Sequence, residues 1–323
     1  MKRLAKSAVI VMAALGSAGC AAALRGGDSD QEVHLHLTYF MARSAGFPEQ
    51  EARAIAAANG HTDYHAETTS VGTERRAVAG LVNPLTFPWI LGAGLSDVAF
   101  GDQSLERAVL SRAGDATKWS LSPLAHRLHF PATGVYAKTE PAFVRDPRSG
   151  EVYYNNREAV IVLEHAFRAL EVHDPDRPRT LALLGIGLHT IQDSYKHRGF
   201  CAALGHAGAW PDADDISRDL GMALEIAEAT LNSLRHARRL ESGASTDGPA
   251  DWRRAFERMY AKPLEAGESR RDRWVAWIRD AFGDEFGTWE ATQERWRAEG
   301  GDEAFESALV LLRPIPLRER NER

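Results

Sequence analysis

The stretch that decides the fold spans residues 185–200 and reads GIGLHTIQDSYKHRGF. Three of its side chains, those of His189, Asp193 and His197, follow one another at intervals of four residues. Residues four apart lie on one face of an α-helix, one turn above the next. The spacing therefore predicts a helix that presents two imidazoles and a carboxylate along a single stripe.

Two interpretations of this stripe stay open. Two imidazoles and a carboxylate form a ligand set that suits Zn²⁺. Alternatively, the three side chains form a hydrogen-bond network in the core, in which Asp193 accepts from both imidazoles. Burying an unpaired carboxylate between Leu188 and Ile191 would be costly, so Asp193 needs a partner, and a metal ion is one.

The N-terminus has the pattern of an export signal. Three basic residues precede a short apolar run over residues 8–15, and small residues then lead to Cys20. This ending resembles the lipobox of bacterial lipoproteins, so we expect a signal peptide over 1–19, lipidation of Cys20 and a linker over 20–30. The alternative is an ordinary secretory signal without a lipid. Ala21 is not acidic, which favours a lipid anchor in the outer membrane of the cell envelope, on its periplasmic or surface side.

The net charge and the cysteine content limit the kinds of function and of stabilisation that the sequence allows. Removal of residues 1–19 takes the formal net charge from −6 to −9. Such an acidic surface argues against non-specific binding of duplex nucleic acid. With Cys20 lipidated, only Cys201 remains, so the sequence provides no disulfide framework. A chain of this length can bury a substantial core without one.

Helical periodicity dominates the rest of the chain, and we expect an all-α, multi-helix bundle around a metal site, with a long irregular insertion. Predicted helices cover about 31–46, 49–58, 155–172, 179–196 and 213–240, and two or three more follow over 252–312. Residues 60–133, rich in proline and glycine, are expected to be irregular. We predict a metal-binding domain over 31–242 and C-terminal helices over 250–315 that pack on it.

Other histidines lie near acids or in short motifs along the chain. His34 precedes Thr38 and Tyr39, an Ala45-Gly46 turn follows, and Asp63 comes after an alanine-rich segment. His129 opens a His-Phe-Pro segment, and His206 lies nine residues beyond His197. Each has an ordinary alternative: His129 as a loop histidine, and Asp63 as a helix cap or turn residue. Of His34 and His36, we expect one to face inward and the other not.

Taken in order, these motifs resemble the bacterial zinc-dependent phospholipase C superfamily, which includes the single-strand-specific nucleases, and are closest to an uncharacterised branch of it. The resemblance covers under half of the chain, and its central element is the His-x-x-x-Asp pair His189 and Asp193. It implies one or two zinc ions, or another divalent metal, with catalytic roles for Asp63 and Asp193. The implied metal ligands are His34, Asp63, His129, His189, Asp193, His197 and His206.

The chain departs from the family pattern at two points. Family enzymes use the free amine of the mature N-terminus as a ligand, but here that amine would be acylated at Cys20. The family's final acid falls on Trp210, with Asp212 and Asp215 as the nearest acids. A complete three-metal cluster is therefore not expected.

The resemblance implies an exported zinc-dependent hydrolase of phosphoester bonds that resembles phospholipase C and acts on a phosphoester or phospholipid. Bound Zn²⁺ lowers the pKa of its water to about 7. Lys196 and Arg198 border the motif and either offset phosphate charge or face solvent. Residues 66–122 would form a rim or lid. The rival is a non-catalytic lipoprotein with a structural or vestigial metal, and a third interpretation is a core without metal.

Overall fold

The structure is a computed structural model, which describes residues 32–65, 67–68, 124, 128–129, 157–197, 219–243, 252–261, 265, 268–284 and 286–313. Within these ranges all regular secondary structure is helical, so the all-α prediction is confirmed. Several predicted features lie outside the described residues, namely the signal peptide, Cys20 and the linker after it, most of the insertion, Arg198 and His206.

Three short helices open the described chain. A π-helix, η1 (Glu32–Leu37), runs directly into α3 (Thr38–Ser44), because Leu37 keeps a right-handed helical backbone. Gly46, with a φ of 92°, turns the chain toward α4 (Glu49–His61), which begins after Pro48. Helix α4 extends three residues beyond the predicted end, through Asn59 and Gly60, although both are poor helix formers. Its end packs against α11, and this tertiary contact overrides the local propensity.

The predicted stripe lies on α11 (Arg177–Lys196), which is paired with α10 (Arg157–Glu171). The Asp176 side chain caps α11 by accepting a hydrogen bond from the backbone N–H of Arg179 at 3.1 Å. Every side chain of α11 from Thr180 onward is buried. An amphipathic helix exposes one face, so α11 is instead the central helix of the bundle.

Five helices follow, four of them in the region where two or three were expected. They are α13 (Leu220–Ser242), α14 (Trp252–Ala261), α15 (Arg270–Phe282), α16 (Trp289–Ala298) and α17 (Gly301–Leu312). Gly283 and Gly300 both have positive φ, so helix α15 ends at the first and α17 begins after the second. These two breaks divide the predicted C-terminal segment.

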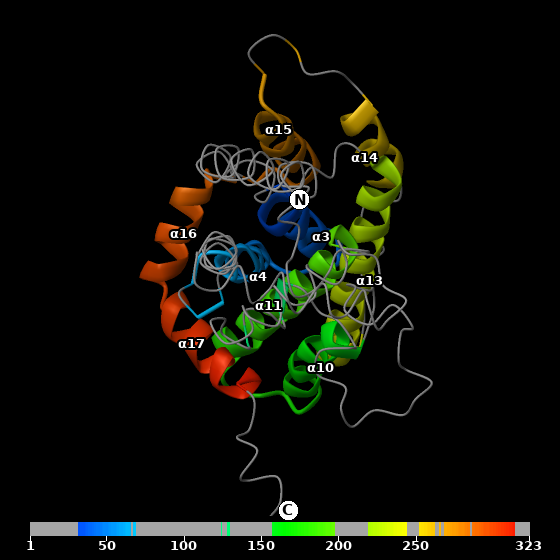
Figure 1. The fold of residues 1–323 in the computed structure, drawn as a ribbon. Helices are drawn as coiled ribbons and strands as arrows, with labels where there is room; N and C mark the ends of the chain where they lie inside the picture. The colour runs from blue at the N-terminus through cyan, green and yellow to red at the C-terminus, as the bar shows by residue number, and fades with distance from the viewer. Residues whose placement is uncertain are drawn as a thin grey trace, which may run out of the picture.

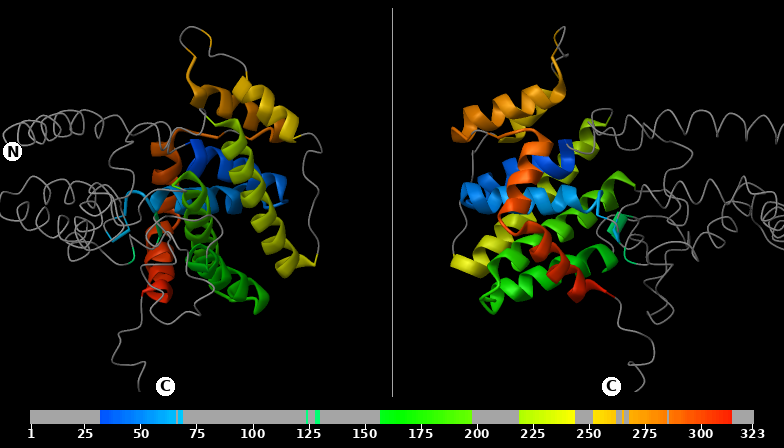
Figure 2. Two further views of the ribbon diagram at one scale, coloured as in Figure 1. Left: turned by 45° about the vertical axis from the view of Figure 1, so that its right-hand side comes forward. Right: turned by 90° about the vertical axis from the view of Figure 1, so that its left-hand side faces the viewer.

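The helices pack around one hydrophobic core (Figure 1). Helix α11 lies at its centre and contacts α4, α10, α13 and α17. The C-terminal helices join the same core, since α15 packs on η1 and α16 on α4. The two further views in Figure 2 show α10 and α11 side by side. None of the described helices combines the length and apolar character of a membrane span.

Candidate metal centre

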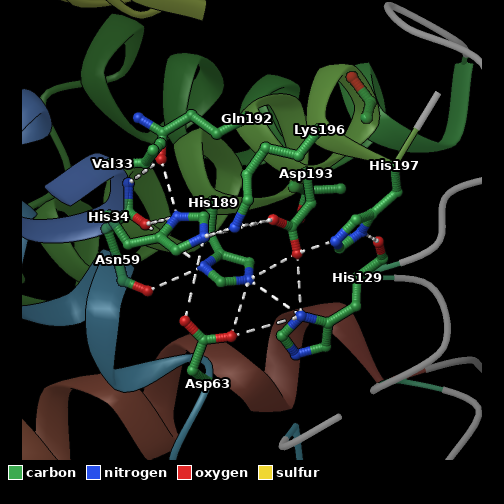
Figure 3. Close-up of polar contacts among 12 residues, drawn as sticks. Val33, His34, Asn59, Asp63, His129, His189, Gln192, Asp193, Lys196 and His197 are labelled. Carbon is green, nitrogen blue, oxygen red and sulfur yellow. Dashed lines mark hydrogen bonds and ion pairs between the residues drawn. The ribbon is translucent and has the colours of Figure 1, made fainter. Parts of the chain in front are cut away.

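Histidines and acids from several segments meet beside α11 (Figure 3). His189 and Asp193 come from α11, His34 from η1, and Asp63 from the turn after α4. His129 belongs to a segment that was expected to be irregular but has helical backbone at Leu128 and His129. The four side chains other than Asp63 are at most 2 % exposed, whereas that of Asp63 is 14 % exposed.

Each of three imidazoles is oriented by an oxygen on its outer side. His189 Nδ1–H donates to the backbone carbonyl of Asn59 at 3.0 Å, and His129 Nε2–H donates to that of Thr68 at 2.7 Å. His34 Nδ1–H donates to the side-chain oxygens of Gln192 at 2.9 Å and Asn59 at 3.1 Å. Carbonyl oxygens only accept hydrogen bonds, so in each neutral ring the other nitrogen carries the lone pair.

The three remaining nitrogens point at Asp193. Its Oδ2 lies 3.0 Å from His129 Nδ1 and 3.1 Å from His189 Nε2, while its Oδ1 lies 3.2 Å from His34 Nε2. Asp63 Oδ1 is 3.6 Å from His129 Nδ1 and 3.7 Å from His189 Nε2. Outer-sphere orientation of this kind is typical of metal-ligating histidines.

Two groups of ligand atoms are close enough to hold a metal ion. One contains His129, His189 and Asp193, and the other contains His34, Asp63 and His189; within each, the ligand atoms lie within 4.8 Å of one another. Asp193 Oδ1 and Asp63 Oδ2 are buried, and the part of the chain that the structure describes gives neither a hydrogen-bond donor. Buried carboxylate oxygens that lack donors fit a cation. The residues present can therefore hold a metal ion, as the sequence predicted in outline.

Several hydrogen-bond acceptors converge at this centre, and their proximity shifts the pKa values of the side chains. Burial opposes ionisation of Asp193, but the charges of His189, His197 and Lys196 outweigh it and hold the pKa of this carboxyl well below its usual range. Burial and the neighbouring His34 lower the pKa of His189 to about 4. Burial also opposes protonation of His129, yet its hydrogen bond to Asp193 and the two nearby carboxylates raise its pKa to about 9. Without a metal, His129 Nδ1–H therefore donates a hydrogen bond to Asp193 Oδ2.

Two other histidines discussed from the sequence lie outside these ligand groups, and the position of a third is not described. His197 lies at the edge, where its Nδ1–H donates to the His129 carbonyl at 2.8 Å and stays 3.9 Å from Asp193 Oδ2, so it belongs to neither ligand group. His206 lies outside the described residues. The expectation that only one of His34 and His36 faces inward is wrong, because both are buried. His36 packs against Trp274 and Phe286, away from the centre.

Sequence reasoning missed the residues that orient the imidazoles, namely Asn59, Thr68 and Gln192. Gln192 follows His189 by three positions on the same helix, which is a usable signal for a neighbouring side chain. Asn59 and Thr68 act partly through backbone carbonyls of other segments, and a carbonyl carries no residue-specific signal. Lys196, which was expected at the border of the motif, is 4 % exposed.

The chain matches no protein-family model, no curated protein and no solved structure.

Proposed function

We propose that the protein is a zinc-dependent hydrolase of phosphoester bonds, with the metal held by His129, His189 and Asp193 and with Asp63 beside it. The observation that carries the proposal is the convergence of oriented imidazole nitrogens on one buried carboxylate. Nitrogen and oxygen ligands from this set are those that zinc prefers. Bound zinc supplies an acidified water and a Lewis acid for the phosphoryl oxygen.

Asp63 is assigned the role of orienting the attacking water and accepting its proton. Its side chain is the most exposed of the four, at 14 %, so substrate and water would reach the centre from its side. Its carboxylate lies within 3.7 Å of both His129 Nδ1 and His189 Nε2, close to the atoms that would bind the metal. A general base must lie within reach of the proton that it removes, directly or through one water.

The order of motifs along the chain resembles that of the zinc-dependent phospholipase C superfamily. This resemblance supports a phosphoester as the substrate class. In this proposal the chain is exported, is anchored through Cys20 and acts on phospholipids or other phosphoesters at the envelope.

Palmitate labelling of intact cells tests the anchor. We expect incorporation that a Cys20→Ala substitution abolishes, and labelling that survives the substitution would contradict an anchor at Cys20.

A non-catalytic, structural metal site is the second candidate, because the ligands are so deeply buried. His189 is 0 % and Asp193 is 1 % exposed. Structural zinc sites are closed by four protein ligands, whereas catalytic sites keep one position for water. The two candidates predict the same metal content but differ in the coordination of the metal and in turnover.

The test combines metal analysis with an assay on bis(p-nitrophenyl) phosphate. We expect the purified chain to contain zinc, to lose hydrolysis on chelation and to regain it when zinc is returned. Zinc without turnover would favour the structural site. A chain that binds no zinc even when zinc is supplied would contradict both.

His189→Gln and His36→Gln form a matched pair for this assay, because both replace a histidine that is 0 % exposed. His189→Gln loses a metal ligand, so it should bind zinc at least about 100-fold more weakly and should not hydrolyse the substrate. His36→Gln should lower thermal stability but keep zinc and turnover. Full zinc retention by His189→Gln would show that the site is misassigned.

A further inference from the structure

Lys196, the last residue of α11, turns its side chain back into the centre (Figure 3). That side chain is 1 % exposed. Its Nζ lies 3.3 Å from His34 Nε2 and 3.7 Å from Asp193 Oδ1. The ammonium group therefore lies at the point where a nitrogen lone pair and a carboxylate oxygen converge.

The tautomer of the neutral His34 ring follows from its other contacts. Because His34 Nδ1–H donates to Gln192 Oε1 and Asn59 Oδ1, the Nε2 atom of the neutral ring accepts a hydrogen bond from Lys196. Moving an ammonium group out of water costs several kcal/mol unless a charged partner compensates it. Asp193 is the carboxylate that compensates it here.

The two oxygens of Asp193 face different surroundings. Oδ1 faces His34 and the Lys196 ammonium, at 3.2 and 3.7 Å. Oδ2 faces His129 and His189, at 3.0 and 3.1 Å, where the described side chains offer no lysine or arginine. One side of the carboxylate thus has a lysine ammonium supplied by the chain, whereas the other side has only imidazoles among the described side chains.

We propose that the Lys196 ammonium replaces one metal ion, so that the centre binds a single divalent ion, on the side of His129 and His189. This inference rests on the metal site proposed above, but not on phosphoester hydrolysis. It predicts that removing the lysine charge and side chain opens a second ion position beside His34, whose Nε2 lies 3.2 Å from Asp193 Oδ1 and 4.0 Å from Asp63 Oδ2.

The experiment is equilibrium dialysis of the full chain against Zn²⁺, followed by elemental analysis. We expect one zinc per chain for the wild type, one for Lys196→Arg, which keeps the charge, and two for Lys196→Ala. Two ions on the wild type, or one on folded Lys196→Ala, would overturn the inference. No zinc on the wild type would overturn it together with the metal site. The expected stoichiometries without hydrolysis would support it while contradicting only the proposed activity.

Lys196→Met keeps the inference testable if Lys196→Ala fails to fold, because it retains the side-chain length without the charge. Chelated Lys196→Met should have a lower Tm than the chelated wild type, and added zinc should raise its Tm by more than it raises that of the wild type. If zinc raised the Tm of the two proteins equally, the result would contradict the proposal that the Lys196 ammonium replaces a metal ion.

Discussion

At the scale of the residue, His129 couples metal binding to pH. Its Nδ1 lies 3.0 Å from Asp193 Oδ2, and its pKa is raised to about 9 because the hydrogen bond and the carboxylate charges outweigh the opposing effect of burial. At neutral pH, below this pKa, the metal-free ring is protonated. A metal ligand must offer a lone pair, so this proton has to leave when the metal binds.

We therefore predict that zinc binding near pH 7 releases about one proton from His129, and that affinity rises about tenfold per pH unit up to about pH 9. Titration calorimetry in buffers of different ionisation enthalpy measures the released protons. His129→Gln, which has no such proton, is the control and should lose this component. Binding without proton release by the wild type would mean that His129 is not a ligand.

The predictable part of the site was the part that lies on one helix. His189 and Asp193 were found because a four-residue interval places both on one face of α11. The inward turn of Lys196 was not predictable, since a lysine at a helix end is usually solvated. That His36 would pack against Trp274 likewise depends on a helix more than 200 residues away in sequence, which no local pattern encodes.

At the scale of the element, the position of the centre depends on how closely α11 packs against its neighbours. A Cβ on Gly185 would lie 2.5 Å from the backbone oxygen of Ile55 and 2.9 Å from the backbone nitrogen of Asn59, both on α4. A Cβ on Gly187 would lie 2.7 Å from the Leu163 side chain on α10. Glycine at these two positions lets α11 approach both helices.

Gly185→Ala and Gly187→Ala should have separable effects. Each should destabilise the fold by roughly 1–3 kcal/mol, because an added methyl group overpacks the core. Only Gly185→Ala displaces Asn59, which orients His189 and His34, so only this variant should also weaken zinc binding, by about 10-fold or more. Urea unfolding and zinc titration check the two effects. Equal zinc affinities for both variants would contradict the role given to the contact between α4 and α11.

The presence of most helices could be predicted from the sequence, because apolar residues recur with helical spacing. The all-α class and the positions of α4, α10 and α11 follow from it. The expected start of α13 near residue 213 is wrong, because Asp219 has an extended backbone and caps a helix that begins at Leu220. The π-helical geometry of η1 was not predictable, since it reflects packing against α4 and α15 rather than local propensity. The division of the C-terminal segment depends on the backbone conformation of Gly283 and Gly300.

At the scale of the whole molecule, a partly buried ion pair joins the N-terminal helices to the C-terminal part of the bundle. Asp284, after α15, accepts from Arg43 Nε at 2.6 Å and from the Tyr39 hydroxyl at 2.8 Å. Burial and this hydrogen bond to Asp284 raise the pKa of Tyr39, so its hydroxyl stays a donor. The contact attaches the C-terminal helices to the helix that follows η1.

Asp284→Ala should cost about 3 kcal/mol of unfolding free energy, near the lower end for a buried pair because Arg43 is 22 % exposed. The variant should keep the zinc stoichiometry of the wild type, since Asp284 belongs to neither ligand group. Asp280→Ala, an exposed change on α15 four residues before Asp284, is the control and should be nearly neutral. A large loss of stability in the control would contradict the assignment to the ion pair.

The measurement that tests the central claim most directly is anomalous diffraction at the zinc edge from crystals of the zinc-loaded chain. We predict one strong peak, about 2.0–2.2 Å from His129 Nδ1, His189 Nε2 and an Asp193 oxygen. A map with no peak among these three side chains would contradict the claim that this cluster is a metal centre.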